Sequence, residues 1–428
     1  MNQRYDCVVI GGGPSGSTVA ALVAKAGWRT LQLERTRFPR FHIGESLMPQ
    51  TYWTFKRLGV LEKMKSSDFV KKYSVQFANA AGKESQPFYF DEMNPHESAQ
   101  TWQVLRSQFD HMLLDNAAAS GADVWQEANV TEVLMEKARN DDLPRAVGVN
   151  VARNGSVQRI DARVVVDATG NNALLSRRLG IRKPDPRLRK AAIFAHYRGA
   201  VRDTGKDEGA TLVLSTPNQA GWFWYIPLAN DIVSVGVVGD LEDLIAGRSS
   251  PEQTLDEQIA ACVTVAPRVE RATRASPVHV LSDFSFRSTR CAGEGWVLVG
   301  DAFGFLDPIY SSGVHLALKS GEMAADCIIE GLACGDLSAG QLGRWGRPLN
   351  AGMQAIRKLV YAFYTRGFSF GRFMRQHPQW KRSLVDLLVG DVFRPDPLAI
   401  FETMSGIVPL PDAVELDQPR RAPVAAMG

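Results

Sequence analysis

Short apolar runs separated by glycine-rich turns open the chain and predict parallel strands linked by helices. Residues 5–10 form an apolar run that leads into Gly11-Gly12-Gly13-Pro14-Ser15-Gly16. An alanine-rich segment follows, and a second apolar run, residues 29–33, ends at Glu34. Because strand, turn, helix, strand and terminal acid come in this order, the segment is predicted to form a βαβ unit that binds a dinucleotide.

Each glycine of this turn has its own expected role. Gly11 permits the tight turn, Gly13 lets the backbone approach a pyrophosphate, and Gly16 lets helix and strand pack closely. The first N–H groups of the helix, near Ser15, are expected to face the phosphates. Glu34 is placed to accept the ribose hydroxyls, which favours FAD or NAD over NADP.

Further along, the pattern changes to short alternating segments that predict strands. Asn154-Gly155 lies between two such segments, which indicates a hairpin over residues 147–160. The run VVVDATG, which contains Asp167 and Gly170, is predicted to be a buried strand that ends in a small-residue turn. A separate sheet that covers the cofactor is expected from four segments, residues 191–197, 211–214, 222–226 and 232–238.

The chain then returns to the pattern of a nucleotide-binding fold. An apolar strand near residue 297 ends at Gly300-Asp301, and Asp301 is placed to hold a ribityl hydroxyl. A helix is predicted to begin near Gly313, where its first N–H groups face the flavin pyrimidine or a small anion. Residues 341–406 are predicted to be helical, and the tail from Glu415 is expected to be mobile.

Composition adds mainly exclusions. The chain has 428 residues, a net charge of +3 and five cysteines, none of which has metal-ligand spacing. The sequence therefore gives no case for a metal site or for nucleic acid as a partner. Neither a signal peptide nor an apolar run of membrane-spanning length is present, so a soluble cytoplasmic protein without integral membrane association is expected.

Together these motifs resemble the FAD-dependent monooxygenase family with the glutathione-reductase-like fold. Gly11-x-Gly13-x-x-Gly16, Glu34, Arg106, Asp167 and Gly300-Asp301 come in the family's order over roughly the first 340 residues. The resemblance narrows to the halogenase-like branch through three segments: the loop at 38–47, the WxWxIP pattern at 222–227 and the helix start at 307–314.

The resemblance implies an α/β fold in which separate segments build each domain. The FAD-binding domain is expected over residues 1–78, 101–185 and 285–340, and a β-rich substrate domain over 79–100 and 186–284. A C-terminal helical region at 341–414 and a flexible tail at 415–428 complete the expected organisation. Further cofactor-binding residues implied by the resemblance are Arg35, Arg40, Ile43, Gly44, Glu45, Ser46, Arg106, Val130, Pro308, Ser312, Gly313 and Val314.

The resemblance also implies a reaction. Reduced FAD reacts with O₂ to give a C4a-hydroperoxide, whose distal oxygen either attacks an electron-rich ring directly or is captured by halide as hypohalous acid. In halogenating relatives a lysine holds that oxidant, and Lys72 has the matching spacing, with Lys71 as the alternative.

Three aromatic residues are expected in the substrate pocket. Trp222 and Trp224 lie two apart on a β pattern and therefore share one face. Tyr310 stands where tryptophan halogenases carry a glutamate, and a phenol cannot replace a carboxylate base at neutral pH. This difference weakens free tryptophan as a halogenation substrate.

The leading prediction is an FAD-dependent monooxygenase that hydroxylates an electron-rich aromatic substrate, with a tryptophan side chain on a partner protein or peptide as one candidate. The alternatives are a halogenase of a phenol, pyrrole or indole, free or carrier-linked, an FAD-dependent prenyl-chain reductase, and a non-catalytic flavin-binding maturation partner. Because the chain has one dinucleotide fingerprint, reduced nicotinamide is expected either to visit transiently or to act through a separate flavin reductase.

Overall fold

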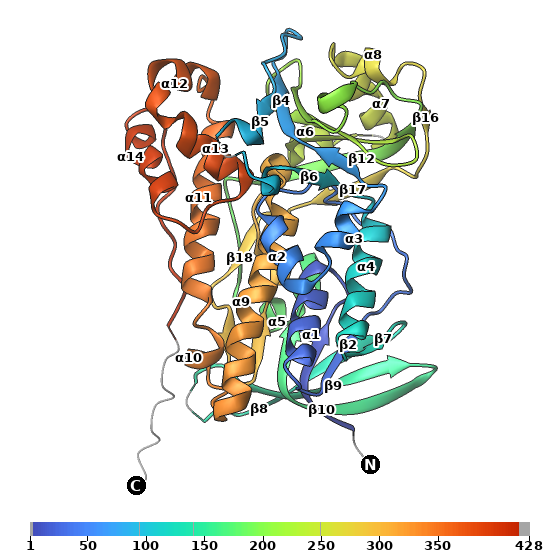
Figure 1. The fold of residues 1–428 in the computed structure, drawn as a ribbon, viewed down its shortest axis with the longest axis vertical. Coiled ribbons are helices and arrows are strands. Elements are labelled where there is room, and N and C mark those ends of the chain that lie inside the picture. Colours follow the sequence, from blue (N-terminus) through green and yellow to red (C-terminus); the bar gives the residue numbers. More distant parts are fainter. Residues whose placement is uncertain (1–2, 94, 140, 249, 419–428) are drawn as a thin grey trace.

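Two large sheets and a group of C-terminal helices make up the fold (Figure 1). The structure is a computed structural model that describes residues 3–93, 95–139, 141–248 and 250–418. The first sheet and its helices lie in the lower part of Figure 1, and the second sheet lies above them. This arrangement agrees with the predicted α/β class.

The first sheet gathers segments from three distant parts of the chain. Its strands are β1 (Gln3–Ile10), β2 (Thr30–Leu33), β7 (Asp123–Trp125), β8 (Asn129–Glu136), β9 (Arg145–Arg153), β10 (Ser156–Asp167), β19 (Ala292–Gly293) and β20 (Trp296–Leu298). They run in the order β19-β20-β10-β1-β2-β7, while β9 also pairs with β10 and β8 pairs with β9. β1 pairs in parallel with both β10 and β2, and Val8 lies opposite Val165. Parallel strands buried on both faces explain why these runs are rich in valine.

Three helices cover this sheet and fix the turn after β1. Helix α1 (Pro14–Lys25) packs against α4 (Arg106–Ala119) and α9 (Ser312–Cys334). Proline at the first position of α1 suits a helix start, because its missing N–H would have no intrahelical acceptor there. The predicted βαβ unit is therefore present as β1, α1 and β2.

The predicted hairpin is confirmed between β9 and β10. Arg153 pairs with Ser156 across the turn. Asn154 and Gly155 both have positive φ, 51° and 76°. Two central residues of positive φ match the right-handed twist of the flanking strands.

The second sheet contains all four β segments predicted between residues 190 and 279. Its strands are β4 (Ser74–Ala78), β5 (Phe88–Tyr89), β12 (Lys190–Arg198), β13 (Thr211–Ser215), β14 (Trp222–Pro227), β15 (Ile232–Asp240), β16 (Thr273–Arg274) and β17 (His279–Ser282). The order is β16-β12-β15-β14-β13-β4-β5, with β17 beside β12. β4 pairs in parallel with β13 and therefore belongs to the second sheet. The predicted FAD-binding segment 1–78 thus ends with a strand of the second sheet.

Alternation along β12 divides the second sheet into two faces. Phe194 belongs to the core shared with the first sheet, whereas Ile193 and Ala195 belong to a separate core. That second core also includes buried residues of α6 (Leu241–Leu244), α7 (Pro251–Ala261) and α8 (Ala266–Val269). One face of the second sheet is therefore directed at the first sheet, and a ligand can lie between the two sheets.

Shorter elements join the two large sheets. β3 (Val70–Lys72) pairs with β6 (Thr101–Gln103), and β18 (Phe286–Ser288) lies between β11 (Arg182–Pro184) and β21 (Gly304–Phe305). The short helices of this part are α2 (Thr51–Leu58), α3 (Leu61–Lys65) and α5 (Leu174–Arg178), with 3₁₀ turns η3 (Gly170–Asn172), η5 (Gly300–Ala302) and η6 (Pro308–Tyr310).

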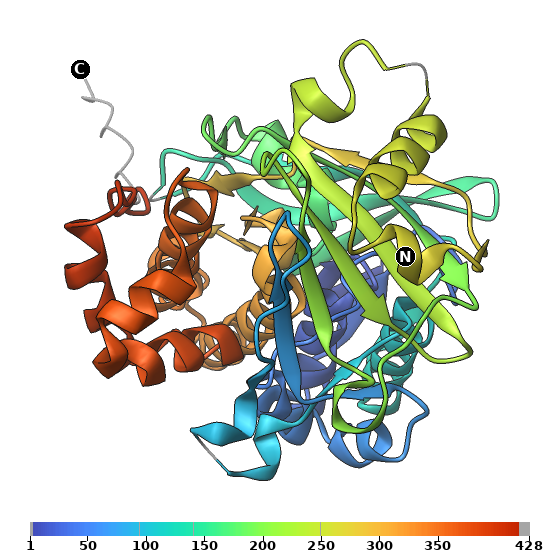
Figure 2. The ribbon, with the colours of Figure 1, turned by 90° about the horizontal axis from the view of Figure 1, so that it is seen from above.

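The C-terminal helices lie on the side of the second sheet where β4 stands, next to the edge strand β5 (Figure 2). They are α10 (Ala339–Leu342), α11 (Gly346–Tyr364), α12 (Phe370–Gln376), α13 (Lys381–Val389) and α14 (Ile400–Ser405). Residues 415–418 have no regular secondary structure, and 419–428, the rest of the predicted mobile tail, lie outside the described residues. Within the described ranges, every helix is too short or too polar to cross a membrane.

Candidate active site

A large cavity of about 780 Å³ lies between the two sheets, beside the turn after β1. It is called the cofactor cleft below. Most residues predicted to bind the cofactor line it, namely Gly11, Gly13, Ser15, Glu34, Arg35, Arg40, Ile43, Gly44, Arg106, Val130, Gly170, Asp301, Pro308, Gly313 and Val314. The fold thus brings together residues as far apart in the chain as Gly11 and Val314.

The glycines of the first turn leave room for a phosphate. Gly11 has φ +117°, and a Cβ there would lie 2.3 Å from the Ala168 carbonyl oxygen. A Cβ on Gly16 would lie 2.2 Å from the Gly11 carbonyl oxygen, so both glycines are needed for close packing. A Cβ on Gly13 would meet only Arg40 Nη2, at 3.7 Å. Gly13 therefore borders open space in the cleft rather than the protein core.

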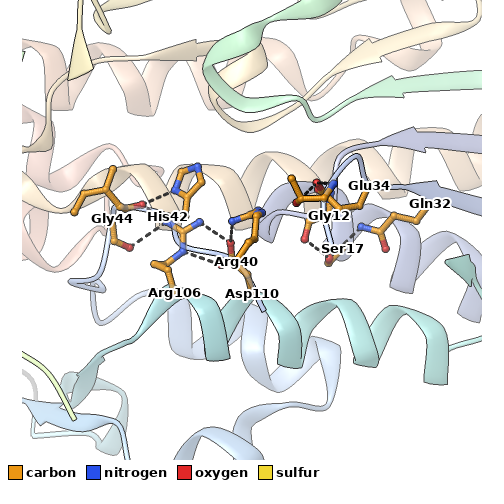
Figure 3. Close-up of polar contacts among 11 residues, drawn as sticks. Gly12, Ser17, Gln32, Glu34, Arg40, His42, Gly44, Arg106 and Asp110 are labelled. Carbon is orange, nitrogen blue, oxygen red and sulfur yellow. Dashed lines mark hydrogen bonds and ion pairs between the residues drawn. The ribbon is translucent and has the colours of Figure 1, made fainter. Parts of the chain in front are cut away.

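The Glu34 carboxylate braces the same turn. Its Oε2 accepts a hydrogen bond from the Gly12 N–H at 2.8 Å, and its Oε1 accepts from Thr36 N and Oγ1 at 2.9 and 2.7 Å. Figure 3 shows Glu34 beside Gly12 at the end of the cleft away from Arg106. The acid is thus held in place at the edge where a ribose would lie.

An ion-pair network on α4 holds the loop that forms the other end of the cleft. Arg106 Nε and Nη2 donate to the two oxygens of Asp110 at 2.7 and 3.0 Å, and Arg40 Nη1 lies 3.1 Å from Asp110 Oδ2. Arg106 also donates to the carbonyl oxygens of Ile43 and Gly44 (Figure 3). Asp110 was not singled out from the sequence, although its spacing four residues after Arg106 on a helix is a signal for such a pair.

Several residues predicted at the cofactor lie elsewhere. Asp167 is buried, and its carboxylate accepts hydrogen bonds from Thr169 N and Oγ1 and from Leu175 N. It stabilises the turn after β10 and does not line the cleft. Gly16, Gly300 and the buried Ser312 likewise do not line the cleft, and a Cβ on Gly300 would lie 2.6 Å from Ser15 Oγ.

Asp301 faces the cleft from the η5 turn. Burial raises the pKa of its carboxyl to about 6, although the Arg106 charge opposes this shift. Within the described residues, no hydrogen bond of the protein reaches this carboxylate. A half-buried acceptor without a protein donor is suited to the hydroxyl groups of a bound ligand.

A smaller cavity of about 80 Å³ adjoins the cleft, with which it shares Ile43, Gly44, Trp224, Phe305, Pro308, Gly313 and Val314. It is called the inner cavity below. Trp222 and Trp224 both line it, with ring centroids 6.2 Å apart, as their shared face predicts. Glu45 and Ser46, predicted at the cofactor, line this cavity instead.

Tyr310 was expected in the substrate pocket but does not line either cavity. Its hydroxyl donates to the Leu359 carbonyl oxygen at 3.2 Å, and its ring lies edge-on to Phe363. The side chain therefore points at α11. Its neighbours Ile309 and Ser311 line the inner cavity.

The two candidate lysines differ in their surroundings. Lys71 is exposed, whereas Lys72 is 4% exposed. Lys72 Nζ donates to Ser46 Oγ at 2.9 Å and to the Leu47 carbonyl oxygen at 3.2 Å, and burial lowers its pKa to about 7. Ser46 Oγ is also 2.8 Å from Thr211 Oγ1, and both residues line the inner cavity. Lys72 thus reaches the cavity through Ser46.

Comparison with known proteins assigns the chain to a family. The family model described as tryptophan halogenase matches residues 6–99 and 91–370. The chain is 30% identical to a 1H-pyrrole-2-carbonyl-[peptidyl-carrier protein] chlorinase of Pseudomonas fluorescens, over 97% of this chain and 95% of that protein. It is 32% identical to the corresponding brominase of Pseudoalteromonas luteoviolacea, over 91% and 93%.

A solved structure supports the same assignment. The structure of the flavin-dependent brominase Bmp2 superposes with a TM-score of 0.82 at 31% identity, covering 94% of this chain and 98% of that one. These relatives favour the halogenation alternative over the hydroxylation that the sequence analysis placed first. The open edge at Gly13, the acid at Glu34 and the free Asp301 carboxylate fit FAD in the cleft. The chain belongs to the tryptophan halogenase family and is an FAD-dependent enzyme of its halogenase-like branch.

Proposed function

We propose that this protein is a flavin-dependent halogenase whose substrate is a pyrrole carried as a thioester on a peptidyl-carrier protein. Two relatives whose names state this activity match more than nine-tenths of the chain at 30% and 32% identity. The observation that carries the proposal is the inner cavity, which adjoins the cofactor cleft but is walled by two tryptophans. Its small volume and mainly apolar walls favour one small aromatic ring.

Trp224 lies at the boundary between the inner cavity and the cofactor cleft. Trp224 lines both cavities, whereas Trp222 lines only the inner one. A ring in the inner cavity is then kept away from direct contact with the flavin edge. A small diffusible oxidant suits this arrangement better than direct oxygen transfer to the ring.

Residues of this chain supply the proton and the hydrogen bonds that the reaction needs. When bound, reduced FAD would supply two of the four electrons that O₂ takes up, and halide would supply the other two as it becomes hypohalous acid. Lys72, with a pKa near 7, carries a proton at Nζ in part of the molecules at neutral pH. Ser46 connects that ammonium to the cavity, so the pair can orient an electrophilic oxidant by hydrogen bonding.

The electrons are proposed to come from a separate flavin reductase. The β1–α1 turn is the dinucleotide fingerprint of the sequence, and the cleft beside it is assigned to FAD. Nicotinamide would then act on free flavin at the partner enzyme.

The deciding experiment supplies the purified protein with a flavin reductase, NADH, FAD and either chloride or bromide. The substrate is a pyrrole-2-carbonyl thioester on a peptidyl-carrier protein, with free pyrrole-2-carboxylate and a simple phenol in parallel. The expected product carries halogen on the ring, as shown by mass and isotope pattern. A product that gains one oxygen and no halogen would instead establish hydroxylation.

A further inference from the structure

Glu45 is a buried carboxylate whose two oxygens differ in their hydrogen bonding. Its side chain is 1% exposed, and its Oε1 lies 2.6 Å from His196 Nε2. Among the described residues, no hydrogen-bond partner reaches Oε2, although Glu45 lines the inner cavity. Burying a polar oxygen without a partner costs free energy, so its position beside the cavity points to a ligand that it serves.

His196 lies between this carboxylate and the cofactor cleft. It projects from β12 and keeps 12% of its side chain exposed. Its ring lies edge-on to Phe41, and Phe41 stacks on His279 of β17 with ring centroids 4.1 Å apart. Phe41 and His279 both line the cleft. A proton on Glu45 therefore has His196 as its neighbour on the side of the cofactor cleft.

The cationic group near Glu45 comes from another element. Lys72 of β3 donates to Ser46 Oγ, so the residue next to Glu45 in sequence carries the link to the ammonium. The inner cavity is consequently bordered by a proton donor reached through Ser46 and by a carboxylate acceptor at Glu45. Ser46 and Glu45 are neighbouring residues of one loop, but Ser46 bonds to Lys72 whereas Glu45 bonds to His196.

Halogenation of an aromatic ring needs such an acceptor. When halogen bonds to a ring carbon, that carbon becomes tetrahedral and cationic, and aromaticity returns only when its C–H bond breaks. The proton must go to a base within reach, and a positioned carboxylate typically accelerates such a step by about 10²–10⁴-fold.

We propose that Glu45 accepts the proton that the aromatic ring loses and that His196 passes it towards the cleft. The proposal rests on the proposed halogenase function. Halogen leaves hypohalous acid for the ring carbon, while the hydroxyl oxygen takes a proton from Lys72 and departs as water. The electron pair of the broken C–H bond restores the ring, and the proton moves to Glu45 Oε2. Solvent then reprotonates Lys72, so the sum is ArH + HOX giving ArX + H₂O.

The test replaces the acceptor while keeping its shape. Glu45→Gln is compared with the unaltered protein using bromide and carrier-bound pyrrole-2-carbonyl thioester, with and without deuterium on the ring carbons. Product formation is expected to fall by about 100-fold or more, the low end of such base effects. A primary deuterium isotope effect absent from the unaltered protein is expected to appear, because C–H cleavage becomes slow.

Two measurements separate this role from a structural one. FAD affinity, measured by fluorescence quenching, is expected to stay within about twofold, since Glu45 does not line the cleft. Unused hypohalous acid is expected to escape and halogenate added monochlorodimedone at an unchanged or higher rate. Glu322→Gln is the matched control, because Glu322 is a mostly buried carboxylate that pairs with Arg57 and Thr54 away from both cavities.

The outcomes are distinct. Full-speed Glu45→Gln, or slow Glu45→Gln without an isotope effect, would overturn the role of Glu45 while leaving the halogenase function intact. His196→Gln is expected to slow repeated turnover more than the first turnover, because the proton is then trapped on Glu45, and equal slowing of both would remove His196 from the path. An unaltered protein that makes no halogenated product would overturn the proposed function and this role with it.

Discussion

Trp222 donates its indole N–H to the hydroxyl of Tyr364 at 2.9 Å, which ties the wall of the inner cavity to the end of α11. Tyr364 in turn donates to Asp307 Oδ2 at 3.0 Å. Burial raises the pKa of Asp307 to about 7 and that of Tyr364 well above its usual range. The chain of hydrogen bonds therefore runs from the second sheet through the C-terminal region to the loop before α9.

Tyr364→Phe is expected to free this tryptophan. The substitution leaves the Trp222 N–H and one Asp307 oxygen without their partner, which costs about 1–3 kcal/mol for buried groups. With its indole no longer fixed, Trp222 is expected to give a broader tryptophan fluorescence spectrum and a raised KM for the aromatic substrate. Urea unfolding, emission spectra and steady-state kinetics check these three effects.

Tyr361→Phe serves as the control for that variant. Tyr361 lies one turn earlier on α11, and its hydroxyl donates to Asp185 Oδ1 at 2.7 Å, away from both cavities. A similar loss of stability with unchanged KM is expected. If both variants raised KM equally, the tie between Tyr364 and Trp222 would have no specific effect on the cavity.

Gly13→Ala is expected to weaken FAD binding without destabilising the protein. The added Cβ would contact only Arg40 Nη2 at 3.7 Å, so the fold has room for it. The same methyl group would occupy space in the cleft where a pyrophosphate approaches the start of α1. We expect at least about tenfold weaker FAD binding, equivalent to about 1.4 kcal/mol, by equilibrium titration.

Gly340→Ala gives the matched control on a second helix. Gly340 lies in α10, and a Cβ there would meet only Ser338 Oγ at 3.7 Å. Replacing a helical glycine by alanine is expected to stabilise the protein slightly and to leave FAD affinity unchanged. A large loss of thermal stability in Gly13→Ala but not in Gly340→Ala would mean that the effect of Gly13→Ala is on folding rather than on the ligand.

FAD binding is expected to weaken as the pH falls through about 6. The pKa of Asp301 is raised to about 6 by burial, so the carboxylate is ionised above that value and protonated below it. Hydroxyl donors of the ligand bind the ionised form more strongly, and binding is therefore favoured at the higher pH. In Asp301→Asn this pH dependence should flatten, and titration of FAD from pH 5 to 8 would show whether it does.

The parts of the site that were predictable from sequence are those set by local order. Gly11, Gly13 and Glu34 lie on one βαβ unit, whose turn, helix and strand spacing largely determine where each side chain goes. Trp222 and Trp224 share a face because strands alternate, and this relation holds whatever the sheet packs against.

The side-chain contacts that the sequence did not predict form between residues far apart in the chain. Glu45 and His196 are 151 residues apart, and nothing in either local pattern indicates that they meet. Tyr310 occupies the position expected from the motif, but its side chain points at helix α11, where its hydroxyl donates to the Leu359 carbonyl oxygen. Packing of this kind is set by the whole fold, so residue order alone does not reveal it.

Lys72→Met is expected to raise stability and abolish halogenation. Burial lowers the pKa of Lys72 from 10.5 to about 7, so between these values the unfolded chain binds a proton that the folded protein does not, and stability rises with pH across this window. At pH 7 methionine removes the free-energy cost of burying the amine but loses the two hydrogen bonds of Lys72. The expected net gain in unfolding free energy is roughly 1–3 kcal/mol, and it shrinks as the pH approaches 10.5. Urea unfolding at pH 7 and 10 measures the gain, and exposed Lys71→Met should change neither stability nor product. A Lys72→Met protein that is less stable at pH 7, or that still halogenates, would contradict this account of the buried amine.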